Sequence, residues 1–587
     1  MPQYSAPLRD HLYCLYDVFD FDGHTRLPGF AEATRDVVEA VLDQAAVFAR
    51  DVVHPLNRPG DEEGCRFQDG MVVTPKGFRE AYRVMVDGGW PALTCDPNHG
   101  GQGLPHMVNV LFEEMMNGAC LSFGLYPGLT RGAYVALSRF GDAAQKALYV
   151  PRLASGEWAG SMCLTEAQAG TDLGLLKTQA LPLDDGSYAI TGTKIFISAG
   201  EHDLTPNIIY LVLARLPDAP AGTKGISLFL VPKVLCDPDG IPGERNRVAC
   251  AAIERKMGIH ASPTCVMNFD GAMGWLVGEP HQGLKAMFAM MNTERIAVGT
   301  QGLAVAEASY QNAVAYARER RQGRASSHGG GRAAADPIIM HPDVRRMLMT
   351  QRALIEGGRA LALWTAQALD VSERHDDETV RQSADDFVAL MTPVAKAFLT
   401  DIGSTCANLG VQILGGHGYM RDNGQEQHVR DVRVTQIYEG TNGVQSLDLL
   451  GRKVLQRRLL PRFAEPVTMF LGATSRVAAM AEFREPVADA LARLDSVTQH
   501  LLAADDQALA AGAAAVDYLR LFALTATGFL WARMAQIALD HPGDDFHSAK
   551  LATARFFMQR ILPQTMSLER AIASGAAPVM ALDEAMF

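Results

Sequence analysis

A change of residue pattern between positions 160 and 275 most constrains the fold of this chain. Residues 31 to 155 repeat apolar side chains every three to four positions, as in "FAEATRDVVEAVLDQAAVFARDVV", which predicts helices. From about 160 to 275, short β-branched and aromatic runs such as "NIIYLVLARL" and "GISLFLVP" are separated by Gly, Pro and Asp, which is typical of antiparallel strands. Helical periodicity then returns. We therefore expect a β-domain inserted between helical regions.

With 587 residues, the chain is too long for one hydrophobic core. We predict an α+β multidomain protein: an N-terminal extension (1–35), an N-terminal helical domain (36–160), a central antiparallel β-domain (161–280), a helical bundle (281–460) and an appended C-terminal helical domain (461–587). The bundle is interrupted by "GRASSHGGGRAAADP" (323–337), which we predict to be a flexible loop. Pro461 is predicted to stop the helix that precedes it.

Composition excludes several classes of protein. The 66 acidic and 53 basic residues leave a net charge of −13, which argues against a general nucleic-acid or anionic-membrane binder. No stretch reaches the ~20 uninterrupted apolar residues of a membrane helix, and the charged N-terminus is no signal peptide. Nine scattered cysteines without a CxxC pair indicate reduced thiols in the cytoplasm and no metal site.

The segment "QIYEGTNGVQ" (436–445) carries the first candidate functional residue, Glu439. A lone glutamate in a soluble chain is most often solvated. Here Gly440 permits close approach of a backbone or ligand, and Thr441, Asn442 and Gly443 are turn formers. This setting indicates a carboxylate held at the mouth of a site.

Two further segments flank or enter the predicted β-domain. In "CLTEAQAGTD", Thr165, Gly170 and Thr171 fall where a helix gives way to strands, and amides of such a turn suit phosphate or heteroaromatic acceptors. A loop capped by threonines explains the same pattern. In "ITGTKIFISAG", Phe196 and Ser198 share one face of a strand and could address one flat ligand. A core phenylalanine beside an exposed serine is the alternative.

A fourth segment, "QILGGHGYMRDNG" (412–424), pairs Gly415 and Gly416 after an apolar helix. The two glycines would let the backbone approach a pyrophosphate closely. A glycine stop at the helix C-terminus explains them equally well. Neither a GxGxxG nor a GxxxxGK[ST] fingerprint occurs in the sequence.

In this order and at these separations, the segments resemble the acyl-CoA dehydrogenase family over nearly the first 455 residues. The matching stretches are "FGDAAQKALYVPRLASGEWAGSMCLTEAQAGTD", "ITGTKIFISAG", "KMGIHASPTCVMNFD", "MMNTERIAVGTQGLAVAEASYQNAVAYARERRQGR" and "QILGGHGYMRDNGQEQHVRDVRVTQIYEGTNGVQSLDLLGRKVL". The start "MPQYSAPLRD" and the extra C-terminal helical domain resemble the long bacterial branch of that family.

The resemblance implies an FAD-dependent enzyme that oxidises the Cα–Cβ bond of an acyl-CoA thioester to a trans-2-enoyl-CoA. Glu439, in the matching YEGT motif, would remove the pro-R α-proton while hydride passes from Cβ to flavin N5. A carboxylate is too weak a base for this proton in water, so a dry site must raise its pKa. Hydrogen bonds from the FAD ribityl 2′-hydroxyl and the backbone N–H of Glu439 would stabilise the enolate charge.

The resemblance also implies the remaining site residues. Thr165 would bind the pyrimidine edge of the flavin, Phe196 would lie against its ring, and Arg320 would reach the FAD of the neighbouring subunit. The full set of expected FAD contacts is Met162, Leu164, Thr165, Gly170, Thr171, Phe196, Ile197, Ser198, Arg320, Gln412, Gly415, Gly416 and Thr441. The expected substrate contacts are Thr171, Asn292, Arg295 and Gly440. Many family members carry aspartate where Asn292 stands, and the sequence after Arg320 departs from the usual pattern.

The partners follow from the same resemblance. We expect an acyl-CoA substrate of undetermined acyl type, electron-transferring flavoprotein as acceptor, and a homodimer or a dimer of such dimers in the cytoplasm. No nucleic acid and no membrane span are expected. Two alternatives stay open: an acyl-CoA oxidase that uses oxygen, and a flavin-retaining DNA-associated binding protein, which the acidic balance disfavours.

Overall fold

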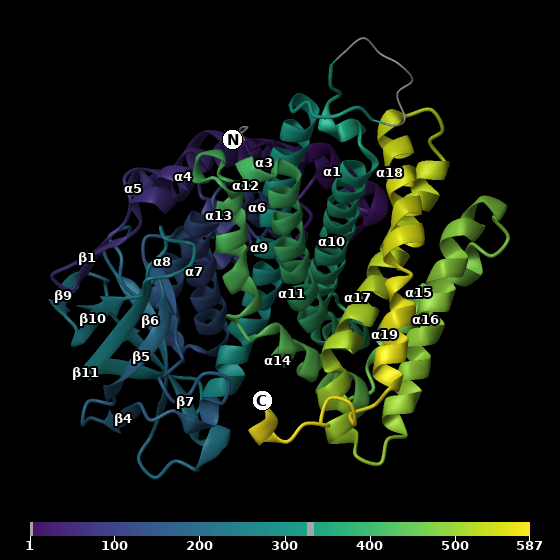
Figure 1. The fold of residues 1–587 in the computed structure, drawn as a ribbon. Coiled ribbons are helices and arrows are strands. Elements are labelled where there is room, and N and C mark those ends of the chain that lie inside the picture. Colours follow the sequence, from purple (N-terminus) through teal and green to yellow (C-terminus); the bar gives the residue numbers. More distant parts are fainter. Residues whose placement is uncertain (1–3, 326–333) are drawn as a thin grey trace. The chain divides into compact units, whose positions relative to one another are not determined.

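The computed structural model describes residues 4–325 and 334–587, so part of the loop predicted at 323–337 lies outside the described residues. The chain forms two compact units (Figure 1). We call Val47–Leu104 with Ala119–Ala297 the β-unit, and Met1–Ala46 with Pro105–Gly118 and Val298–Phe587 the helical unit. The five domain ranges given above stay a prediction.

Helices lie on both sides of the strands of the β-unit in chain order. They are α4 (His54–Glu63), α5 (Phe78–Asp87), α7 (Leu121–Phe140), α8 (Ala143–Ser155) and the first part of α9 (Gly283–Glu319). The start of α8 is a capping box, in which the Asp142 carboxylate accepts from the Gln145 N–H at 2.8 Å. Gly156, with φ of 79°, ends the helix. This helix stop places the next strand three residues further on.

The strands of the β-unit form one seven-stranded sheet and two short hairpins. The sheet strands are β3 (Ala159–Cys163), β4 (Gln179–Pro182), β5 (Tyr188–Ser198), β6 (Ile208–Arg215), β7 (Ile226–Pro232), β10 (Val248–Ile253) and β11 (Thr264–Val277). The hairpins are β1 (Arg66–Gln68) with β2 (Met71–Val73), and β8 (Val234–Cys236) with β9 (Pro242–Arg245). The sheet order is β10-β11-β5-β4-β6-β3, and β7 pairs with both β11 and β6, so the pairings close a ring.

The predicted β-domain is therefore confirmed, with one departure from its antiparallel pattern. β3 pairs parallel with β6 along its whole length, and β4 meets β6 in parallel at a single residue pair. Strands β6 and β7 read as continuous apolar runs because nearly all their side chains are buried. Tyr210, Phe229, Met267 and Phe269 form the centre of this core.

The helical unit contains both short and long helices. They are α1 (Leu8–Leu12), α2 (Phe21–His24), α3 (Arg35–Phe48), α6 (His106–Ala119), the second part of α9, α10 (Pro342–Arg374), α11 (Glu378–Leu414), α12 (Gly416–Tyr419), α13 (Gln425–Val432) and α14 (Asn442–Leu447). The C-terminal part adds α15 (Leu460–Ala473), α16 (Ala481–Leu502), α17 (Gln507–Leu539), α18 (Asp545–Phe556) and α19 (Gln564–Ala573). Among the described residues, α11 and α17 are long and apolar enough to cross a bilayer, but 83% and 56% of their apolar windows are buried inside the protein.

The apolar faces of α17 are covered by the same chain. The helix packs on α16, α18 and α19, and also on α10, α11 and α14 (Figure 1). Trp364 of α10 lies 5.3 Å from the ring of Phe529, and Trp531 donates to the carbonyl of Ala353 at 3.0 Å. The helical segment before Pro461 ends at Gln456, so a helix does stop ahead of this proline. Pro461 itself lies in the first turn of α15, where its missing N–H has no cost.

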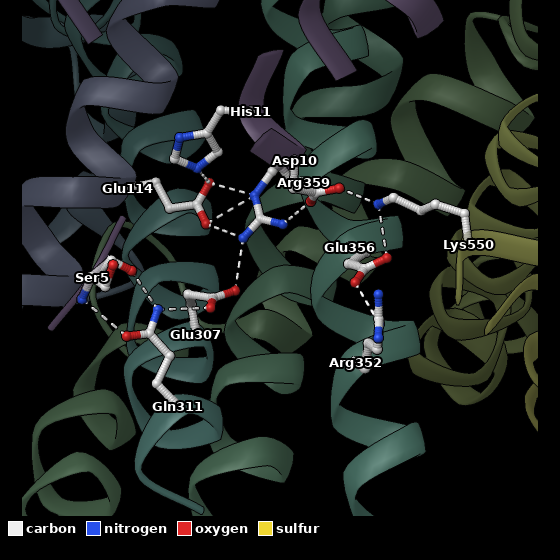
Figure 2. Close-up of polar contacts among 10 residues, drawn as sticks. All are labelled: Ser5, Asp10, His11, Glu114, Glu307, Gln311, Arg352, Glu356, Arg359 and Lys550. Atoms are coloured by element: carbon white, nitrogen blue, oxygen red, sulfur yellow. Dashed lines mark hydrogen bonds and ion pairs between the residues drawn. The ribbon is translucent and has the colours of Figure 1, made fainter. Parts of the chain in front are cut away.

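A buried ionic cluster joins distant parts of the helical unit (Figure 2). Arg359 of α10 binds Glu114 of α6 through Nε and Nη2 at 3.0 and 2.5 Å, and Glu307 of α9 through Nη2 at 2.8 Å. Its Nη1 contacts Asp10 of α1, which also binds Lys550 of α18. The guanidinium thus links the N-terminal segment, the central helices and the C-terminal part.

Candidate active site

The sequence-predicted site residues fall into both units. Glu439, in the helical unit, lies in a left-handed turn with φ of 53°, and φ of Gly440 is 86°. A non-glycine residue in this conformation costs on the order of 1 kcal/mol, so surrounding contacts must hold it. The Glu439 carbonyl accepts from Gln445 Nε2 at 3.3 Å, and Tyr438 donates its hydroxyl to Gln301 Oε1 at 2.5 Å. The Glu439 side chain is half-buried.

Helix α11 anchors the residues that follow the glutamate. Lys396, which is fully buried, donates from Nζ to the Gly440 carbonyl at 2.8 Å and to Asn442 Oδ1 at 3.0 Å. Asn442 Nδ2 in turn donates to Thr400 Oγ1 at 3.0 Å and to Asp401 Oδ1 at 2.8 Å. Burial raises the pKa of Asp401, and its two amide donors and Lys396 only partly oppose this effect. The turn is thus bound to one face of a long helix.

Thr441, an expected FAD contact, caps the next helix. Its hydroxyl oxygen accepts from the Val444 N–H at 3.3 Å at the start of α14. The hydroxyl hydrogen remains a donor in this arrangement. The residue can therefore cap the helix and donate to a ligand at the same time.

The paired glycines lie at the end of α11. Gly415, with φ of 59° and ψ of −135°, ends this helix, and Gly416 begins α12. Both glycines and Gln412 are exposed, and no described atom lies within 4 Å of a Cβ built at either glycine. The positive φ confirms the helix-stop explanation for Gly415. At Gly416 the surface is open, and the predicted close approach of a pyrophosphate there stays a prediction.

Arg320 lies near this glycine loop. It is exposed and follows the last residue of α9, and Tyr316 of that helix binds His417 Nδ1 through its hydroxyl at 2.7 Å. Gln412 and Lys396 are 16 residues apart on α11, which separates them by about 24 Å along a regular helix. The helical unit therefore carries two distinct groups of candidate residues, the glycine loop with Arg320 and the turn with Glu439.

In the β-unit, the loop after β3 is bound to strand β5. The Leu164 carbonyl accepts from Lys194 Nζ at 3.0 Å, and the Thr165 carbonyl accepts from the Ile195 N–H at 2.9 Å. Lys194 also binds Glu166 Oε1 at 2.8 Å, and both side chains are buried. Burial alone would raise the pKa of Glu166, but Lys194 and further donors outweigh it and lower the pKa to about 2. An ionised pair thus fixes the half-buried Thr165.

The next residues of this loop and of β5 are exposed. Gly170 and Thr171 lie on the surface, whereas Met162, in β3, is buried. Phe196 has φ of 58° where the register of β5 and β11 shifts, which marks a β-bulge, and its ring is 60% exposed. The alternative of a core phenylalanine is therefore wrong.

Ser198 is half-buried beside this bulge, and Ile197 between the two residues is in the hydrophobic core. Phe196 and Ser198 are thus both outside the core, but the bulge interrupts the regular alternation from which the shared face was predicted, so that face stays a prediction. Ile197 was expected to touch FAD, but its side chain packs inside the β-unit, so only its backbone remains for such a contact. An exposed ring beside a hydroxyl and a fixed loop suits a flat heteroaromatic group, which the flavin of FAD is.

The expected substrate residues on α9 are placed only in part. The Arg295 guanidinium lies 5.8 Å from the ring centre of Phe288. The side chain of Asn292 lies outside the described residues. Sequence reasoning missed Lys194 and Lys396. Lys396 is a lone lysine in the apolar run "VAKAFL", a pattern that signals a buried partner, whereas Lys194 follows "ITGT" and has no such signal.

Sequence models of known families match nearly the whole chain. They are the acyl-CoA dehydrogenase N-terminal domain at residues 36–157, the middle domain at 161–272, the C-terminal domain at 281–455, and the acetyl-CoA dehydrogenase C-terminal like domain at 463–583. The last of these covers the appended helices that the sequence led us to expect.

Individual relatives agree with these matches. The chain is 45% identical to 3-methylmercaptopropionyl-CoA dehydrogenase of Ruegeria pomeroyi, over 95% of this chain and 96% of that protein. It is 33% identical to the broad-specificity linear acyl-CoA dehydrogenase FadE5 of Mycobacterium tuberculosis, over 100% of both. The crystal structure of ACDH-11 from Caenorhabditis elegans in complex with C11-CoA shares the fold, with a TM-score of 0.78 and 21% identity over 99% of this chain and 95% of that one. The chain is therefore a member of the acyl-CoA dehydrogenase family of FAD-dependent enzymes, in the form that carries an additional C-terminal domain.

Proposed function

We propose that this enzyme oxidises the Cα–Cβ bond of an acyl-CoA to a trans-2-enoyl-CoA, with Glu439 as the base that takes the α-proton. The observation that carries the proposal is the turn itself. A half-buried carboxylate stands in a strained left-handed conformation, and hydrogen bonds from a buried helix face hold the turn. Strain maintained by its surroundings is typical of functional residues.

The residues of the β-unit supply the proposed FAD site. When bound, FAD accepts the hydride that leaves Cβ. The exposed Phe196 ring and the Ser198 hydroxyl would lie against the flavin, and Thr165 would bind its edge. Gly170 and Thr171 would contact the phosphates, and Thr171 would also contact the CoA arm with Arg295. The backbone N–H of Glu439 would polarise the thioester carbonyl and so acidify the α-proton.

The acyl group and the electron acceptor are proposed from the relatives. The similarity to 3-methylmercaptopropionyl-CoA dehydrogenase and to a broad-specificity linear acyl-CoA dehydrogenase supports short linear and thioether acyl-CoAs as the first substrates to test. We infer that electron-transferring flavoprotein accepts the electrons, and that the enzyme works in the cytoplasm as a homodimer. The matches to named dehydrogenases favour this enzyme over a DNA-associated binding protein.

The oxidase alternative shares the same base and flavin site, so only the acceptor separates the two enzymes. Phe196 and Ser198 of β5 are not cationic, and Lys194 of the same strand is buried and paired with Glu166. A cation there would favour the superoxide anion that forms when oxygen is reduced. We therefore expect the substrate-reduced enzyme to reoxidise slowly in air.

A substrate panel tests the proposal. Short, long, branched, aromatic and thioether acyl-CoAs are mixed anaerobically with the enzyme, and the loss of oxidised-flavin absorbance is followed by stopped flow. The reduced enzyme is then mixed with electron-transferring flavoprotein, with ferricenium or with aerated buffer. Fast recovery with the first two supports the dehydrogenase. Recovery in air at the turnover rate, with matching peroxide, would identify an oxidase, and no reduction by any acyl-CoA would contradict the proposed activity.

A further inference from the structure

Lys396 occupies an unusual position for a lysine. It lies within the apolar stretch "MTPVAKAFL" of α11, and its side chain is fully buried. Burial of an ammonium group opposes folding unless oxygen acceptors replace its water. Two of those acceptors, the Gly440 carbonyl at 2.8 Å and Asn442 Oδ1 at 3.0 Å, belong to the turn that carries Glu439. A methionine would fill a similar volume without that desolvation.

The contacts of Lys396 act on the part of the turn that is conformationally strained. Glu439 and Gly440 are both left-handed, and their two carbonyls accept from Gln445 and Lys396 respectively. A hydrogen bond from a charged donor is about twice as strong as a neutral one. The ammonium therefore opposes relaxation of Glu439 toward a right-handed conformation, which would redirect its carboxylate.

Asn442 extends the same attachment. Its amide group donates to the Ala397 carbonyl at 3.1 Å, to Thr400 Oγ1 at 3.0 Å and to Asp401 Oδ1 at 2.8 Å. Lys396 and Thr400 are at positions i and i+4, which lie one above the other on a helix, and Asp401 directly follows Thr400. The turn is thus docked on a rigid element rather than on another loop.

We propose that Lys396 is a positioning residue for the base, whose buried ammonium fixes the left-handed turn so that the Glu439 carboxylate meets the α-hydrogen of the substrate. The inference rests on the proposed role of Glu439. Loss of the hydrogen bonds from Lys396 displaces the Glu439 carboxylate without removing it. A misplacement of about 1 Å can lower the rate about 10²-fold.

The test measures proton abstraction alone. An acyl-CoA analogue with sulfur in place of Cβ has no β-hydride to transfer, so its α-hydrogens exchange with D₂O only through the base. Exchange is followed by mass spectrometry on FAD-loaded enzyme. Lys396→Met is expected to exchange about 10²-fold more slowly, with FAD content and the Kd of the analogue within twofold of wild type. Lys396→Gln, whose amide still donates to the carbonyl, is expected to recover part of the loss.

Three further variants complete the test. Lys550→Met removes another fully buried lysine, which binds Asp10 and Glu356 in the ionic cluster; it should lower the Tm and leave exchange unchanged. Glu439→Gln should abolish exchange, and full exchange in that variant would contradict the proposed function itself. If Lys396→Met gives no folded, FAD-loaded protein, Thr400→Val removes a contact of Asn442 and should still slow exchange. The positioning role would be overturned if Glu439→Gln loses exchange while Lys396→Met exchanges at the wild-type rate. Where Thr400→Val replaces Lys396→Met, a wild-type rate in that variant would overturn it in the same way.

Discussion

Replacement of Arg359 by leucine should destabilise the helical unit strongly. The change leaves the buried carboxylates of Glu114, Glu307 and Asp10 without the guanidinium that binds all three (Figure 2). Removal of one partner from a buried ion pair costs about 3–5 kcal/mol. The pKa of Glu114 agrees in direction, because Arg359 is the largest of the contacts that lower it to about 2 against the effect of burial. We expect a Tm lower by roughly 5–10 °C.

The same variant should reverse the pH dependence of this cluster. Burial raises the pKa of Glu114, but in the wild type Arg359 and then His11 outweigh burial and lower it to about 2. The stability it contributes is therefore present above pH 4.5 and is lost as pH falls toward 2. Without Arg359, burial should raise the pKa of Glu114 and further raise that of Glu307, which burial already raises. The folded variant then binds protons that the unfolded chain does not. The difference in Tm between the variant and the wild type should therefore shrink as the pH is lowered.

Thermal unfolding followed by circular dichroism at about pH 8 and about pH 5.5 measures both effects. Arg35→Leu is the matched control, because Arg35 makes an exposed pair with Asp22 at 2.6 Å, and such pairs contribute at most about 1 kcal/mol. A Tm of Arg359→Leu within about 1 °C of the control, or a deficit that grows on acidification, would refute the electrostatic account.

Three other changes test separate parts of the structure. If the proposed contact of Gly416 with the FAD of a neighbouring subunit holds, Gly416→Val should purify depleted of FAD, because no described atom of the chain lies within 4 Å of a Cβ built there. Stoichiometric FAD would contradict that contact. Gly415→Val is a poorer probe because a φ of 59° strains any side chain. Truncation at Pro461 should cause aggregation by uncovering α10 and α14; a soluble and active truncation in size-exclusion chromatography would count against this. Glu166→Gln should weaken FAD binding measured by fluorescence titration, since it leaves Lys194 without an ionised partner; an unchanged Kd would show that the loop does not need the pair.

Local sequence patterns predicted the parts of the fold that depend on local rules. The strands β5, β6 and β7 follow alternating or continuous apolar runs, and the structure has them within a few residues of the predicted segments. The candidate turn formers around Glu439 also form a turn, because glycine and short polar residues favour one in any context. The resemblance to the family could be recognised from the sequence because each of its motifs is a contiguous stretch of residues.

Contacts between residues far apart in sequence were not predictable. Lys396 meets the carbonyl of Gly440, and Arg359 meets Asp10, only after helices from different parts of the chain have packed. A lysine within an apolar stretch of sequence indicates that its ammonium group needs buried acceptors, but the sequence does not identify those acceptors. The bulge at Phe196 was not predicted because the residue with the left-handed φ is a phenylalanine, whereas a glycine at that position would have indicated a bulge.

The proposed role of Glu439 is tested most directly by single-turnover flavin reduction in Glu439→Gln. Glutamine keeps the shape of the side chain but cannot accept the α-proton. With the best acyl-CoA of the panel, we expect the variant to keep its FAD and its flavin to be reduced at least ~10²–10⁴ times more slowly than in the wild type. A near-normal rate of flavin reduction in the FAD-loaded variant would contradict Glu439 as the base.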